Sequence, residues 1–139
     1  MIRFTVFIGV AALFLFSSFC ESEAVIPVPE SGNYILTGRI SDTVLMPPAC
    51  GMFAFATAVE MEIISYSDTS YKHDRIVVVY TCPDFNKDKE YFKIGKIHTF
   101  IVQDHNPASF GWIIMDSEKL KENNLPYDLY VIDDGIGGK

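Results

Sequence analysis

Three cysteines are the residues of this chain best suited to covalent chemistry, and they lie in two different settings. Cys20 follows shortly after an apolar N-terminal run, whereas Cys50 and Cys82 lie in the body of the chain. A thiol nucleophile needs a histidine beside it, and His98, the only histidine within a predicted strand, is expected to be structural. In an exported chain an even pair of cysteines favours a disulfide. The sequence therefore predicts a bond between Cys50 and Cys82, with two free buried thiols or a reactive or metal-binding pair as the alternatives.

Glu60 and Glu62 are the one carboxylate pair that shares a face of a predicted strand. Two such side chains lie roughly 6.5 to 7 Å apart, which is within the spacing that paired acid–base catalysis uses. A strand end that reaches water explains the pair more simply. We therefore predict no catalytic residues, and a hydrolase or thiol enzyme is the least favoured functional class.

The segment DFNKD, residues 84–88, has the opening pattern of a calcium-binding loop. However, Lys89 stands where the turn glycine belongs, and Gly95 stands where the closing glutamate belongs. We interpret the segment as a solvated turn. The sequence thus predicts neither a metal site nor a cofactor.

Four aromatic residues in or beside predicted loops are the candidate binding residues: Tyr66, Tyr71, Phe110 and Trp112. The two tyrosines belong to the polar connection SYSDTSYKHD, and the other pair follows the segment PAS at residues 107–109. Aromatic side chains held in loops at one end of a barrel are common binding anchors. The alternative is that they plug the end of the core.

Residues 1–24 have the layout of a secretory signal peptide. Arg3 gives a positive start, and residues 4–16 form an almost uninterrupted apolar run. The segments SFC at residues 18–20 and SEA at residues 22–24 both fit a cleavage pattern, and we favour cleavage after Ala24. The run is shorter than the about 20 apolar residues of a membrane span. The alternative is a lipid anchor on Cys20, although Phe19 stands where a bacterial lipobox has a small residue. We expect a secreted or cell-envelope protein, in the periplasm or at the outer surface, that contacts a membrane only when lipidated.

Acidic side chains outnumber basic ones along the chain. The formal charge of the whole chain is −7, and it is about −6 once Arg3 and the two glutamates before Ala24 are removed. Such a surface repels phosphate backbones and anionic lipids. Because no Lys/Arg cluster accompanies the aromatic residues, we expect no nucleic-acid binding.

The stretch CGMFAFATAVEMEI, residues 50–63, combines helix-forming residue types with the two-residue period of a strand. In a helix Glu60 and Glu62 would project about 200° apart, whereas in a strand the large side chains share one face and the alanines share the other. The pattern predicts a strand whose alanine face is closely covered. Its acidic end, from Glu60 onward, is expected to reach water.

Further strands are predicted at residues 34–40, 75–82, 94–103, 111–115 and 127–133. A short helix is expected at about 117–123, with Asp116 or Ser117 capping its amide groups and Asn124 with Pro126 ending it. Antiparallel pairing of the strands at 50–63 and 75–82 would bring the two cysteines together. The predicted fold class is mostly β, a small antiparallel barrel of the oligonucleotide/oligosaccharide-binding type or a β-sandwich, with five to six strands and one short helix.

The predicted organisation is a signal peptide at residues 1–24, a linker at 25–33, a single β domain at 34–134 and a flexible tail at 135–139. The linker contains two prolines and a glycine with little periodicity. One domain of this length has room for one modest core.

The motifs PPACGMFAFATAVEMEI and VVVYTCPDF together resemble those of uncharacterised small exported proteins of Bacteroidota-type bacteria, over residues 38–102. A looser similarity is to netrin-like inhibitor domains, which are disulfide-bonded barrels; those begin with cysteines at the mature N-terminus, and this chain has none near Val25. We expect an exported, non-enzymatic module that binds a protein or a glycan. A structural or accessory envelope lipoprotein, anchored through Cys20, is the alternative.

Overall fold

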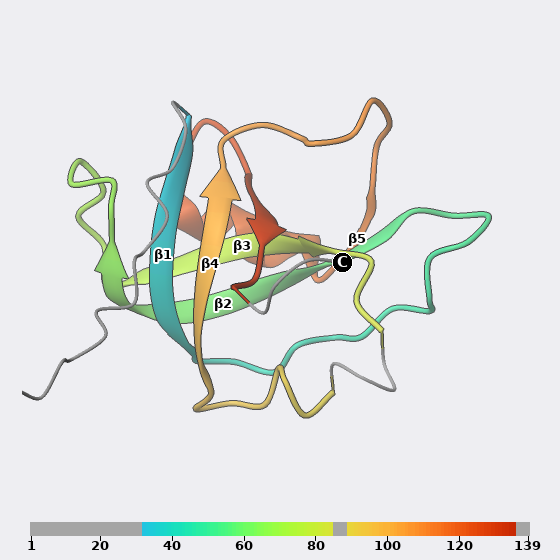
Figure 1. Cartoon of the computed structure of the whole chain (residues 1–139), viewed down its shortest axis with the longest axis horizontal. Coiled ribbons are helices and arrows are strands. Elements are labelled where there is room, and N and C mark those ends of the chain that lie inside the picture. The colour runs from blue at the N-terminus through green and yellow to red at the C-terminus, as the bar shows by residue number, and fades with distance from the viewer. Residues whose placement is uncertain (1–31, 85–88, 136–139) are drawn as a thin grey trace, which may run out of the picture.

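The computed structural model describes residues 32–84 and 89–135 of the chain. In this part of the chain six strands and one short 3-10 helix follow one another (Figure 1). The strands are β1 (Asn33–Ile40), β2 (Phe55–Tyr66), β3 (Arg75–Thr81), β4 (Ile97–Gln103), β5 (Ile113–Met115) and β6 (Leu129–Asp133), and the helix η1 (Ser117–Asn123) lies between β5 and β6. Each predicted element has its counterpart here, with strand ends that differ by a few residues.

Five of the strands close into a barrel in the order β1, β4, β6, β3, β2, and β2 returns to β1. β5 is an additional strand that pairs with the first residues of β2. Figure 1 shows β1 and β4 crossing β2 and β3 steeply, as closure of a small barrel requires. The prediction of a mostly β fold with one short helix is confirmed, in its barrel form. Two pairings, of β5 with β2 and of β6 with β3, are parallel rather than antiparallel, which long connections allow.

The two faces of β2 explain its mixed composition. Val59 and Met61 point into the barrel core, while Ala56 and Ala58 on the opposite face are also fully buried. The helix η1 packs against β2 and β3 on that outer side. The small alanine side chains leave room for this helix, so η1 is the close cover that the sequence predicts.

The core lies inside the barrel and takes side chains from all five closing strands. Its largest fully buried members include Phe100 on β4, Leu36 on β1 and Leu129 on β6. The other buried members of the cluster are Ile40, Val59, Met61, Ile76, Val78, Tyr80, Phe92, Val102 and Val131. Each such side chain contributes about 1.5 to 3 kcal/mol on burial, so the barrel interior supplies most of the driving force for folding.

A bulge where β1 meets the end of β2 fixes how the barrel closes. Gly38 is opposite Ile63 and Thr37 is opposite Ser65, so Ile64 is an extra residue in β2. A Cβ on Gly38 would lie 3.0 Å from the carbonyl oxygen of Glu62, which explains the absence of a side chain there. Beyond the bulge the alternation of β2 is reversed, and Tyr66 therefore faces inward, opposite the buried Leu36.

Two local predictions differ from the structure. Asp116 precedes η1 in a left-handed conformation and makes no side-chain cap bond to its amide groups, because its carboxylate is turned toward Lys119. Glu60 is only 7% exposed, although the pattern predicts that it reaches water. Among residues 32–84 and 89–135, no helix has the length and apolar character needed to cross a membrane.

Candidate functional site

A disulfide joins Cys50 to Cys82, as predicted, with 5.4 Å between the two Cα atoms. The antiparallel pairing of β2 with β3 brings them together, since Ala56 is opposite Thr81 and the Cys82 amide donates to the Phe55 carbonyl at 2.9 Å. The bond anchors the long connection between β1 and β2 to the end of β3. An intramolecular disulfide is typical of an oxidising compartment outside the cytoplasm.

Beside this disulfide, large apolar side chains lie open to solvent on two neighbouring segments. Met52 and Phe53 are 96% and 60% exposed, and Phe110 and Ile113 are 53% and 48% exposed. The segments are joined by a hydrogen bond of 2.8 Å from the amide of Ile113 to the carbonyl of Ala54. In Figure 1 they lie at the right, where β5 runs beside the start of β2. We call these four side chains the apolar surface.

Trp112, the neighbour of that surface, is held in place rather than free. Its indole N–H donates to the Asn106 side-chain oxygen at 2.8 Å, and the Asn106 amide donates to the Phe110 carbonyl at 2.7 Å. The rings of Phe110 and Trp112 are 5.0 Å apart. Of this predicted pair, Phe110 is therefore the exposed member, and Trp112 fixes the loop that presents it.

Tyr66 and Tyr71, the other predicted pair, belong to a different end of the barrel. Their rings meet edge to face with centroids 5.8 Å apart, and Tyr34 lies 5.8 Å from Tyr66 on β1. All three pack against the core cluster. Figure 1 shows the connection between β2 and β3 at the left of the barrel, away from the segment that carries Phe110 and Trp112. The structure thus separates the two predicted pairs, and the tyrosines close the core.

The hydroxyl groups of the two tyrosines differ in their partners. Tyr71 donates to the carbonyl oxygen of Arg75 at 2.7 Å. The hydroxyl of Tyr66 is buried and has no hydrogen-bond partner among the described residues. Burial and, after it, the charge of Asp68 raise the pKa of Tyr66 well above its usual value.

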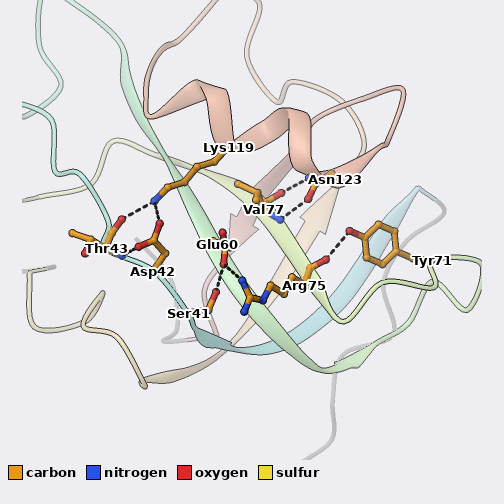
Figure 2. Close-up of polar contacts among 9 residues, drawn as sticks. All are labelled: Ser41, Asp42, Thr43, Glu60, Tyr71, Arg75, Val77, Lys119 and Asn123. Atoms are coloured by element: carbon orange, nitrogen blue, oxygen red, sulfur yellow. Dashed lines mark hydrogen bonds and ion pairs between the residues drawn. The ribbon is translucent and has the colours of Figure 1, made fainter.

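A polar cleft of about 200 Å³ lies on the outer wall of the barrel, between β3 and the end of η1. Its polar lining residues are Glu60, His73, Asp74, Arg75, Glu122 and Asn123. Figure 2 shows Glu60 between Ser41 and Arg75 on this side of the molecule, with Asn123 against Val77 nearby. Sequence reasoning missed this cleft because its residues come from β2, the connection before β3, β3 itself and η1.

Glu60 is the buried acid of the cleft. Its Oε1 accepts a hydrogen bond of 2.7 Å from the Ser41 hydroxyl and faces the Arg75 guanidinium at 3.4 Å. The sequence gives only a weak indication that Glu60 is buried. A glutamate that follows three alanines on one strand face lies close to whatever covers those alanines, so it shares their cover.

Lys119 holds η1 against the outer wall of the barrel. Its Nζ lies 2.8 Å from Asp42 Oδ2 and donates to the Thr43 carbonyl at 2.8 Å (Figure 2). The same Nζ lies 3.0 Å from Asp116 Oδ2. The side chain of Lys119 is only 14% exposed. The hydrogen bond from Lys119 lowers the pKa of Asp42, so the pair is charged at neutral pH.

The remaining site predictions concern metals and the N-terminal segment. Across the described ranges, no group of three or more histidine, cysteine, aspartate or glutamate side chains is placed to hold a metal ion. The signal peptide, Cys20 and most of the DFNKD segment lie outside the described residues. Compared with known proteins, the chain matches no protein-family model, no curated protein and no solved structure.

Proposed function

We propose that this protein is an exported, non-enzymatic binding module whose apolar surface docks onto a partner protein. The observation that carries the proposal is the exposure of Met52, Phe53, Phe110 and Ile113 on adjoining segments. Large apolar side chains gathered on a surface commonly mark an interaction site. The disulfide at Cys50 and the hydrogen bonds of Trp112 hold both segments, which lowers the entropy cost of binding.

The composition of the apolar surface favours a protein over a glycan as the partner. Aromatic residues and methionine are enriched at protein–protein interfaces. Met52 and Ile113 offer no flat ring on which a sugar could stack. The formal charge of about −6 that remains after cleavage following Ala24 favours a partner that is neutral or basic around a matching apolar patch, because like charges across an interface are repelled.

The setting of the proposed function is the cell envelope or the medium outside it. The disulfide between Cys50 and Cys82 supports a compartment outside the cytoplasm. The expected signal peptide at residues 1–24 supports export. Cleavage after Ala24 would release the module, whereas lipidation of Cys20 would hold the same module at a membrane.

The experiment is a binding measurement on the oxidised, full exported protein with substitutions on the apolar surface. A partner is first cross-linked in the native host, identified and purified, and its affinity is then measured by isothermal titration calorimetry. The double variant M52S/F53S is expected to weaken binding at least tenfold, since central aromatic and methionine anchors carry most interface energy. The matched control is I64S, which removes another exposed apolar side chain, 53% exposed, at the β2 bulge.

The proposal is wrong if I64S weakens partner binding as much as M52S/F53S does. It is also wrong if neither variant changes the affinity for the partner. Self-association that is seen by analytical ultracentrifugation and abolished by M52S/F53S would show instead that a second copy of the chain covers the surface, and it would overturn the assignment to a different protein.

A further inference from the structure

We infer that the cleft beside Glu60 binds an organic cation, an ammonium or guanidinium group of the kind carried by lysine and arginine side chains or by small amines. This site lies on the outer wall of the barrel, formed by β2, β3, the connection between them and η1. It is separate from the apolar surface, and the inference does not depend on the proposed function.

The first support is the unused oxygen of a buried carboxylate. The side chain of Glu60 is 8% exposed, and both of its side-chain contacts, with Ser41 and with Arg75, are made by Oε1. Oε2 has no hydrogen-bond donor among the described residues, and Glu60 lines the cleft. A carboxylate that has lost most of its water binds strongly to any donor that reaches it.

The second support is the balance of charge around the cleft. Asp74 and Glu122 also line it, and neither carboxylate forms an ion pair within the described part of the chain. Among the described residues that line the cleft, the one fixed positive charge is Arg75, which is 66% exposed and lies 3.4 Å from Glu60. One guanidinium offsets only one of the three carboxylates that line the cleft, so the cleft keeps a net negative charge.

The size and shape of the cleft decide what kind of cation fits. The carboxylates do not converge as metal ligands do, since no metal-holding group occurs in the described residues. The volume of about 200 Å³ is below the roughly 300 to 1,000 Å³ of pockets for larger ligands. A single charged head group on a short apolar stem suits this space, with one N–H donated to Oε2 of Glu60 and longer-range attraction from Asp74 and Glu122.

The test is a titration of the isotope-labelled, disulfide-bonded protein with small probes, followed by amide NMR shifts. Ethylguanidinium and butylammonium are the cationic probes, and N-ethylurea is the neutral analogue of the first. We expect saturable shifts at Val77 and Asn123 with both cations and none with N-ethylurea. E60Q is expected to weaken binding at least fivefold, while E62Q, which neutralises the exposed acid two residues further on the same face, changes it by less than twofold.

A second variant keeps the test decisive if E60Q fails to fold. D74N/E122Q neutralises two exposed acids of the cleft without disturbing a described hydrogen bond of either side chain, and it is expected to weaken cation binding by at least twofold at low salt. Equal shifts with N-ethylurea, or full affinity in both E60Q and D74N/E122Q, would overturn the inference. M52S/F53S should leave cation binding unchanged, which separates this result from the test of the apolar surface.

Discussion

The side-chain amide of Asn123 takes the place of a neighbouring strand beside Val77. Its Oδ1 accepts from the Val77 amide and its Nδ2 donates to the Val77 carbonyl, each at 2.7 Å. β6 pairs with β3 only at Val78 and Val79, so Asn123 completes the ladder one residue before that pairing begins. With Asn123 only 3% exposed, this pair of bonds holds the end of η1 against the barrel.

We predict that N123A destabilises the fold more than any other single truncation on η1. The substitution leaves a buried N–H and a buried C=O without partners, at a cost of about 2 to 4 kcal/mol in the free energy of unfolding. N123D should also destabilise, because a carboxylate cannot donate to the Val77 carbonyl. Urea unfolding followed by circular dichroism measures both, with the exposed neighbour in E122A as the control. A loss below about 1 kcal/mol in N123A would contradict this account.

We predict that removal of the hydroxyl group has opposite effects on the free energy of unfolding at Tyr66 and at Tyr71. Y66F removes a buried hydroxyl that has no partner among the described residues, so we expect the free energy of unfolding to rise by about 1 kcal/mol. Y71F removes the 2.7 Å bond to the Arg75 carbonyl and should lower the free energy of unfolding by about 0.5 to 1.5 kcal/mol. Chemical unfolding of the two variants side by side is the measurement. Equal losses in both would show that Tyr66 has a partner.

The disulfide is predicted to stabilise the whole barrel. Its two cysteines are 32 residues apart in sequence, and opening a loop of this length costs about 3 to 4 kcal/mol in the chain-entropy account. C50S/C82S leaves no free thiol in the domain and should lower the free energy of unfolding by that amount. Guanidinium unfolding of the variant and of the oxidised parent gives the difference. An unchanged midpoint would mean that the bond fixes only the local loop.

Much of the fold follows from local pattern. Alternation up to Ile63 in β2 distinguishes a strand from a helix in spite of its alanines, and the β-branched run of β3 ends at Pro83. The antiparallel pairing of these two strands then places Cys50 beside Cys82. Each of these inferences uses residues that are near in sequence or constrained by one hairpin.

The features that pattern did not reveal depend on contacts between distant segments. Closure of the barrel uses the bulge opposite Gly38, and the cover over Glu60 depends on Lys119 of η1 reaching Asp42. Near Glu60 in the sequence, only the alanines that precede it on the same strand face point to that cover. The two tyrosines and the pair Phe110 and Trp112 look alike as loop aromatics, yet of these four only Phe110 is exposed, at 53%. The exposure of a side chain depends on tertiary packing, and residue type alone does not determine that packing.

The environment of His98 predicts how the stability of the fold depends on pH. Its ring is half-buried, stacks on Phe100 and lies 3.9 Å from the ring of Tyr91 between centroids, with a 2.7 Å hydrogen bond to the Tyr91 carbonyl. Burial lowers the pKa of His98 below the ordinary value of 6.5, and the charge of Lys96 acts in the same direction, while the bond to Tyr91 and the charge of Asp134 oppose it. The neutral ring therefore donates Nε2–H to Tyr91.

Because the pKa of His98 is lower in the folded state than in the unfolded state, protonation favours unfolding. The stability that the neutral ring contributes is present above pH 6.5 and is lost as pH falls below that value toward the folded pKa. We expect the free energy of unfolding to fall between about pH 7 and pH 5.5 in the parent and to change less in H98Q, whose amide can still donate to Tyr91. NMR titration of the His98 ring protons gives the folded pKa directly. A folded pKa at or above 6.5, or an equal pH dependence in H98Q, would show that burial of this ring does not control its protonation.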